Sequence, residues 1–144
     1  MNKLYIALLL VIGISGYLQN NPDLTSAFTE QSIQNEQAIT DAYQNQLSNI
    51  QVSGSGEVSR ILSDDNKGSR HQRFILRLSS GQTVLIAHNI DLAPKISTLK
   101  KGDIVQYFGV YEWNSKGGVI HWTHHDPAGQ HAGGWLKHNG RKYQ

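Results

Sequence analysis

The sequence predicts a mainly β domain, a small five-stranded barrel with an N-terminal helix before it. Three observations support this fold class. Short runs rich in β-branched and aromatic residues recur between glycine-marked turns in the second half of the chain. Once the apolar N-terminus is set aside, about a hundred residues remain for a core, which suits one small domain. A stretch in the first third of the chain has helical rather than strand periodicity.

Residues 1–18 have the profile of a secretory signal or a membrane anchor. Lys3 precedes an apolar run from Leu4 to Ile12, and Gly13–Ile14–Ser15 offers a small-x-small cleavage site. The alternative is an uncleaved anchor, although the apolar stretch is shorter than the roughly 20 residues that span a bilayer comfortably. We therefore expect an exported protein, periplasmic or secreted, whose N-terminus engages the export machinery or stays in the membrane.

Residues 19–50 form a polar segment for which we predict a helix. Asn21 followed by Pro22 is typical of a helix N-terminus. An amphipathic helix is expected over about Glu36 to Asn49, because apolar residues recur there at helical spacing, namely Ile39, Tyr43, Leu47 and Ile50. This apolar stripe either docks on the domain that follows or belongs to a helical spacer between membrane and domain.

Residues 51–144 form the β domain. Ser53–Gly54–Ser55–Gly56 is expected to end the helix. The predicted strands are Glu57–Leu62, His71–Leu78, Gln82–His88, Ile104–Trp113 and Val119–Thr123. Between the third and fourth strands, Pro94 and the spacing of Ile96 and Leu99 predict a short helix of one or two turns. This order is that of an OB-like barrel, with a β-sandwich fragment or an SH3-like barrel as the alternative.

Composition excludes several function classes. The chain has no cysteine, which removes disulfide scaffolds, thiolate nucleophiles and cysteine zinc sites. It also has no glycine-rich phosphate loop, dinucleotide fingerprint or serine nucleophile elbow. Residues 51–144 carry 12 Lys and Arg against 7 Asp and Glu, so the domain is mildly basic and tolerates anionic partners.

The stretch "HWTHHDPAGQHAGGWLKH", residues 121–138, contains five histidines. A straight strand would place His121 and His125 about 13 Å apart, and Pro127 would end a helix, so we expect the chain to turn here. In the predicted barrel the third and fifth strands are parallel neighbours whose ends lie together. We therefore expect one rim site, in which His88, Asn89 and Asp91 lie beside the segment 124–126 and His131 or His138 folds back over it.

The candidate site residues lie on this rim and on the second strand. We assign catalytic roles to His88, His124, His125 and Asp126. The candidate metal ligands, for zinc, magnesium or manganese, are His88, His124, Asp126 and His131. The candidate substrate contacts are Arg70, His71, Arg73, Asn89 and Trp122, since arginine suits bidentate recognition of anions.

Structural roles are the alternative for many of these residues. His121 fits a strand position with one hydrogen bond, His138 fits a solvated surface, and the exposed face of the second strand fits ordinary solvation. The three tryptophans fit core and rim packing, which leaves no stacking platform; they are Trp113, Trp122 and Trp135.

Three motifs carry a family resemblance: "AHNIDLAP" at 87–94, "YEWNSKGGVIHWTHHDP" at 111–127 and "GWLKHNGRKY" at 134–143. With them, residues 52–144 resemble the bacterial domain-of-unknown-function family 3465, which is marked by HNI and HWTH motifs. The matching positions here are His88 to Ile90 and His121 to His124. The resemblance supports the choice of site and implies no established activity.

From the residues we expect a monomeric, exported domain whose rim binds a divalent metal and hydrolyses a phosphodiester or another anionic substrate. The metal would polarise an oxygen or lower the pKa of bound water, and a histidine would move the proton. The alternative is a non-catalytic periplasmic binding module for nucleic acid, a glycan or a protein partner. A third possibility is a structural or metal-buffering role for the histidines.

Overall fold

The computed structural model describes residues 22–144, with side chains from residue 30 onward. Contacts divide the chain into two units, residues 1–34 and residues 35–144, and the whole barrel lies in the second. The predicted signal or anchor at residues 1–18 lies outside the described part. Within residues 22–144, no helix combines the length and the apolar character needed to cross a membrane.

Helix α2 (Pro22–Gln44) begins at Pro22 as predicted and ends five residues before the predicted boundary at Asn49. It ends early because Gln46 and Asn49 adopt left-handed φ angles of 54° and 61°, which stop a right-handed helix. The part of α2 from residue 35 onward docks on the barrel, since Ile39 and Ala42 are buried in its core. The predicted apolar stripe is therefore confirmed over this turn, whereas Leu47 is 46% exposed.

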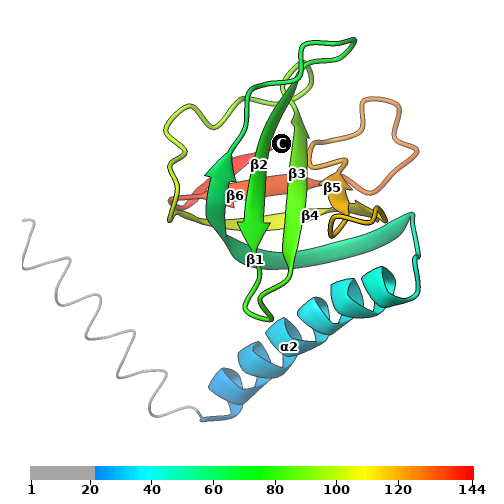
Figure 1. Cartoon of the computed structure of the whole chain (residues 1–144). Coiled ribbons are helices and arrows are strands. Elements are labelled where there is room, and N and C mark those ends of the chain that lie inside the picture. Colours follow the sequence, from blue (N-terminus) through cyan, green and yellow to red (C-terminus); the bar gives the residue numbers. More distant parts are fainter. Residues whose placement is uncertain (1–21) are drawn as a thin grey trace, which may run out of the picture. The chain divides into compact units, whose positions relative to one another are not determined.

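Seven strands follow, and their bounds are β1 (Ile50–Ile61), β2 (His71–Arg77), β3 (Thr83–Asn89), β4 (Ile104–Glu112), β5 (Val119–His121), β6 (Trp135–His138) and β7 (Arg141–Tyr143). The first five form a mixed barrel in the order β1-β2-β3-β5-β4, closed by pairing of β4 with β1 (Figure 1). The predicted parallel pairing of the third and fifth strands is confirmed. The hairpin β6–β7, which was not predicted, extends the sheet beyond β4.

The segment Ser53–Gly56 lies inside β1, although the sequence predicted a break there. Its glycines serve close packing within the strand. A Cβ atom on Gly54 would lie 2.6 Å from the hydroxyl oxygen of Tyr107, and one on Gly56 would lie 3.0 Å from the carbonyl oxygen of Arg77. Glycine in a strand often marks such a close approach.

The prediction of a helix between the third and fourth strands is wrong, because residues 90–101 contain only turns, a bend and irregular backbone. Buried side chains of the barrel take the backbone groups that a helix would pair internally. Gln72 exchanges two hydrogen bonds with the backbone of Ile96, both 2.9 Å long, and His88 bonds the carbonyl of Pro94 at 3.0 Å. Ile96 and Leu99 are buried in the core even without the helix.

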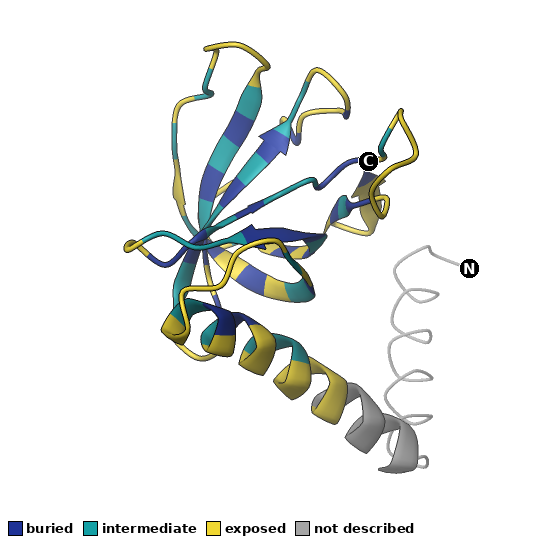
Figure 2. Cartoon of the chain, turned by 90° about the vertical axis from the view of Figure 1, so that its right-hand side faces the viewer, coloured by how far each residue is buried: buried dark blue, intermediate teal, exposed yellow. Residues whose placement is uncertain are grey.

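Strands β2 and β3 alternate between the core and the outer face, as the sequence predicted for β2. In Figure 2 this alternation appears as bands of buried and half-buried residues along the strands. Phe74, Leu76 and Ile86 face the core, whereas Arg73, Ile75 and Leu85 are half-buried on the outer face. This outer face of β2, β3 and β5 carries the two hollows described next.

Candidate functional site

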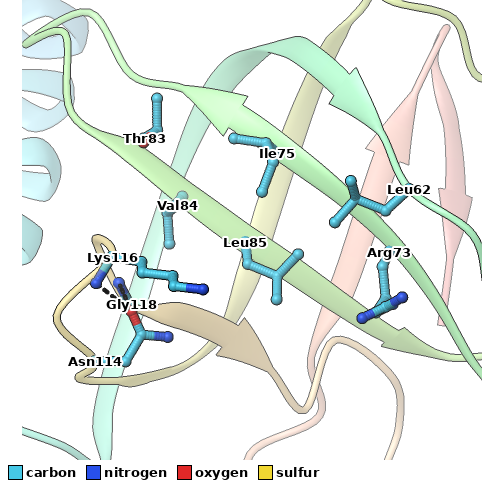
Figure 3. Close-up of a pocket in the computed structure, with 9 residues that line it drawn as sticks. All are labelled: Leu62, Arg73, Ile75, Thr83, Val84, Leu85, Asn114, Lys116 and Gly118. Carbon is cyan, nitrogen blue, oxygen red and sulfur yellow. Dashed lines mark hydrogen bonds between the residues drawn. The ribbon is translucent and has the colours of Figure 1, made fainter. Parts of the chain in front are cut away.

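The first hollow lies over the middle of β2 and β3 and is here called the Arg73 hollow. Its volume is about 250 Å³, and its lining residues are Leu62, Arg73, Ile75, Thr83, Val84, Leu85, Asn114, Lys116 and Gly118. Figure 3 shows the apolar side chains of Ile75 and Leu85 between Lys116 at one end and Arg73 at the other. The hollow therefore has an apolar floor between two cationic ends.

The β4–β5 loop forms one wall of the Arg73 hollow and has the predicted hairpin structure. The Asn114 side-chain oxygen accepts hydrogen bonds from the backbone N–H groups of Lys116 (2.9 Å) and Gly118 (3.0 Å). Gly118 has a φ of 93°, which favours glycine, and a Cβ atom there would lie 2.3 Å from the ring of Tyr111. These contacts fix the backbone that presents Lys116 to the hollow.

The second hollow lies where β3 and β5 end and is here called the histidine hollow. Its volume is about 360 Å³, and its lining residues are Ser69, His71, Ala87, Asn89, Leu92, His121, Trp122 and His124. It adjoins the Arg73 hollow, because His71 lies two residues from Arg73 on β2 and Ala87 lies two residues from Leu85 on β3. Such a step is roughly 7 Å, so the two hollows are neighbours on one face of the sheet, and together they are here called the β2–β3–β5 groove.

The structure brings four of the predicted site residues together around the histidine hollow: His71, Asn89, Trp122 and His124. The ends of β3 and β5 do meet there, as the parallel pairing predicts. A backbone irregularity shapes this end of β5, since Trp122 has a φ of 53°, which a non-glycine residue rarely adopts. Thr123 consequently turns into the core while Trp122 and His124 both line the hollow.

His88 lies on the other side of the sheet, fully buried in the barrel. Its Nε2–H donates to the carbonyl of Pro94 at 3.0 Å, and its Nδ1 accepts from the hydroxyl of Thr123 at 2.8 Å. Burial lowers the pKa of His88 from 6.5 to about 4, so the ring is neutral near pH 7. Because both nitrogens are already bonded, His88 supports the rim from inside and offers no free atom to a ligand.

Asp126 closes the loop that follows β5. Its carboxylate accepts hydrogen bonds from the backbone N–H groups of Ala128 (2.9 Å), Gln130 (2.7 Å) and His131 (2.8 Å). These bonds, that of Ala128 foremost, hold the pKa of the Asp126 carboxyl below its usual range. His125 is exposed, and its carbonyl oxygen accepts from the ring of His124.

The predicted metal-ligand set is not assembled. Among the side chains that the structure describes, from residue 30 onward, no three of His, Asp or Glu are grouped so that they could hold a metal ion. His88 and Asp126 use their polar atoms on the protein itself, as described above. His131 does fold back, as expected, but its ring stacks on Trp122 with the centroids 4.2 Å apart.

Three imidazoles line the histidine hollow, and each is held by a hydrogen bond on one ring nitrogen. Nδ1 of His124 donates to the carbonyl of His125 at 2.7 Å, and Nδ1 of His71 donates to the carbonyl of Ser69 at 2.8 Å. Nε2 of His121 lies 3.2 Å from a carboxylate oxygen of Glu112. Since a carbonyl only accepts, Nε2 of both His71 and His124 carries the lone pair in the neutral ring.

The two arginines predicted to contact substrate, Arg70 and Arg73, differ in whether a carboxylate already binds them. Arg70 is bound to Asp91, which accepts from both the Nε (2.7 Å) and the backbone N–H (2.7 Å) of Arg70. These bonds hold the pKa of the Asp91 carboxyl below its usual range. The guanidinium of Arg73 donates to the carbonyl of Ser63 at 3.0 Å and has no carboxylate partner among the described residues.

His138 does not fit the solvated role that its position near the C-terminus indicated. It is 2% exposed, and its Nε2 lies 2.8 Å from a carboxylate oxygen of Asp103, which also accepts from the backbone N–H of Lys100 at 2.9 Å. Trp135 fits the packing role, since its ring stacks on Phe108 with centroids 6.2 Å apart. Both belong to the β4–β6 pairing rather than to the groove.

Sequence reasoning missed Lys116 and the apolar floor of the groove. Lys116 lies in the β4–β5 loop, for which the sequence predicted a hairpin turn and no binding role. Ile75 and Leu85 were visible as apolar residues on the outward face of their strands, where charged residues are more usual, and this was the available signal.

A comparison with curated proteins found no match to this chain. A family model described as "Protein of unknown function (DUF3465)" matches residues 23–144, which include the whole barrel, both hollows and the C-terminal hairpin. The resemblance inferred from the HNI and HWTH motifs is thereby confirmed, and the chain belongs to the DUF3465 family.

Proposed function

We propose that this protein is an exported OB-like barrel that binds single-stranded nucleic acid in the β2–β3–β5 groove. The strand order β1-β2-β3-β5-β4, with a parallel β3–β5 pair, is the one we associate with OB-like barrels, which bind oligonucleotides over strands two and three. The observation that carries the proposal is the groove itself. It lies over these strands, and within it the unpaired cations Arg73 and Lys116 flank an apolar floor.

The charge of the groove favours an anionic ligand. No carboxylate is among the residues that line either hollow, and in neighbouring loops Asp91 is paired with Arg70 and Asp64 with Lys95. Arg73 and Lys116, in contrast, have no ion pair among the described residues. The uncompensated charge of the groove is therefore positive, which attracts phosphates and makes binding salt-dependent.

The apolar floor favours nucleic acid over other polyanions. Ile75 and Leu85 lie between the cationic ends, and the imidazoles of the histidine hollow add flat aromatic surfaces farther along. Single-stranded nucleic acid presents apolar base faces on an anionic backbone, and such binding combines cationic tracks with aromatic contacts. A sulfated glycan carries comparable charge without base faces, so this floor suits it less well.

The metal-dependent hydrolase that the sequence favoured has less support than binding. Its four ligands do not converge, and two of its four catalytic candidates, His88 and Asp126, are bound to the protein itself. We therefore place the binding function first. Export, rather than cytoplasmic action, follows from the signal or anchor proposed for residues 1–18.

Fluorescence anisotropy with a labelled oligodeoxythymidine tests this proposal on the full-length chain. We expect binding that weakens with salt and a double variant, Arg73→Ala with Lys116→Ala, whose log K against log salt slope is smaller by about 1.4. Lys100→Ala with Lys101→Ala is the matched control, since it removes two exposed lysines outside the groove. Equal loss in both variants, or a preference for a sulfated oligosaccharide at equal charge, would contradict the proposal.

A further inference from the structure

We propose that the histidine hollow cleaves RNA by acid–base chemistry, with His124 as the base and His121 as the acid. This inference rests on the proposed binding of nucleic acid in the groove. The reaction takes place at one end of that groove, and it gives His121 and His124 a role beyond binding.

His124 has the features of a base built into a site. Its side chain lines the hollow although the residue is only 4% exposed. Its Nδ1–H donates to the carbonyl of His125 at 2.7 Å, which fixes the tautomer and leaves the lone pair on Nε2. Nε2 has no partner among the described residues and is not sealed from solvent. Because Nδ1 is already bonded, Nε2 is the ring nitrogen left for a ligand in the hollow.

The backbone around His124 is arranged to hold this ring in place. The left-handed φ of 53° at Trp122 lets both Trp122 and His124 line the hollow. Residues in such conformations persist where the surrounding structure over-determines them, and they cluster at functional sites. Beyond them, the backbone N–H of Gly134 donates to the carbonyl of His124 at 2.9 Å and ties the returning loop to the site.

His121 lines the same hollow, and its ring also contacts the indole of Trp122. The ring centroids of His121 and His124 are 6.3 Å and 5.3 Å from that of Trp122. Nε2 of His121 bonds Glu112 at 3.2 Å, so Nδ1 is the nitrogen left for a ligand. When His121 is protonated, the Glu112 carboxylate balances its charge, and Nδ1–H can donate a proton. In the proposed reaction His124 acts through the lone pair on Nε2, and His121 acts in its protonated form through the N–H on Nδ1.

The reaction needs only these two groups and the RNA. Nε2 of His124 takes the proton of a ribose 2′-hydroxyl, and the O2′–P bond forms. The P–O5′ bond breaks, and Nδ1–H of His121 gives its proton to the departing O5′. The products are a 2′,3′-cyclic phosphate and a 5′-hydroxyl end, so no oxidant, water or metal enters the balance. DNA lacks the 2′-hydroxyl and is bound without being cleaved.

The test uses the full-length chain with a single-stranded RNA and a DNA of the same sequence, in the presence of EDTA. Mass spectrometry of the products should show 2′,3′-cyclic phosphate ends from RNA and intact DNA. His124→Asn keeps an amide N–H for the His125 carbonyl but removes Nε2, and it should lower the cleavage rate by about 10²–10⁴-fold. Lys100→Ala with Lys101→Ala is again the control, because it changes two exposed side chains outside the groove.

The possible outcomes separate this inference from the binding proposal. RNA cleavage lost in His124→Asn and His121→Ala, but kept in the Lys100→Ala with Lys101→Ala variant, supports it, provided that both histidine variants still bind the DNA. Tight binding of RNA without cleavage overturns the reaction and leaves the binding function standing. Cleavage that survives His124→Asn or that requires an added metal also overturns it. If neither RNA nor DNA binds in the groove, the proposed function fails together with this inference.

Discussion

The buried imidazole of His88 predicts a specific loss of stability in mild acid. Its pKa is about 4 in the folded chain and 6.5 when unperturbed, mainly because burial disfavours the charged ring. Above pH 6.5 the ring is neutral in both states. As the pH falls from 6.5 towards 4, the unfolded chain binds a proton that the folded chain does not, so the free energy of unfolding falls. Below pH 4 both states are protonated and the loss is complete.

The magnitude follows from the size of the shift. Each pKa unit corresponds to about 1.4 kcal/mol, so the difference between 6.5 and about 4 is worth about 3 kcal/mol. This is a large share of the stability of a small domain. Carboxyls with lowered pKa values, among them Asp103 and Asp126, add their own losses at lower pH, so the His88 contribution has to be isolated by a variant.

Urea unfolding of the wild type and His88→Gln between pH 7 and pH 4 isolates it. Glutamine does not titrate, and its amide can still donate to the Pro94 carbonyl. We expect the wild type to lose about 3 kcal/mol more than the variant over this range. Parallel curves would refute the reasoning, as would an NMR titration of the His88 ring with a pKa near 6.5.

Four further predictions concern packing and the loop. Tyr107→Phe should leave the Tm unchanged or raise it, because the Tyr107 hydroxyl is buried without a hydrogen-bond partner. Gly54→Ala should lower the free energy of unfolding by about 1–3 kcal/mol, because its Cβ would clash with that hydroxyl. Gln72→Ala should cost about 2–4 kcal/mol in urea unfolding, since it orphans the backbone groups of Ile96. Asp126→Ala should free the backbone N–H groups of its loop, seen as faster hydrogen exchange there with the barrel unchanged.

Much of the barrel could be predicted from the sequence because strand alternation is a local signal. The period of two in β2 placed Arg73 outward and Phe74 inward, and both positions are confirmed. The parallel meeting of β3 and β5 followed from the expected strand order. The absent helix after β3 could not be foreseen, because the side chains that replace its hydrogen bonds, Gln72 and His88, lie elsewhere in the chain.

The site was predicted in place but not in detail. Spacing located the rim, yet it could not show that His88 would face the core while its neighbour Asn89 faced the hollow. The sequence also could not show which side chains after β5 face outward. A single residue with a left-handed φ, Trp122, interrupts the alternation of the strand there. Hydrogen bonds formed on folding then decide which polar groups stay available, and they occupy Asp126 but leave Nε2 of His124 unbonded.

The central claim is that the β2–β3–β5 groove is where single-stranded nucleic acid binds. The most direct measurement is a two-dimensional NMR titration of the isotope-labelled chain with a short oligodeoxythymidine. We expect the largest chemical-shift changes on Arg73, Leu85 and Lys116, with further changes on His71 and Trp122. Shifts confined to the β6–β7 hairpin, or no shifts at a saturating concentration of the oligonucleotide, would contradict it.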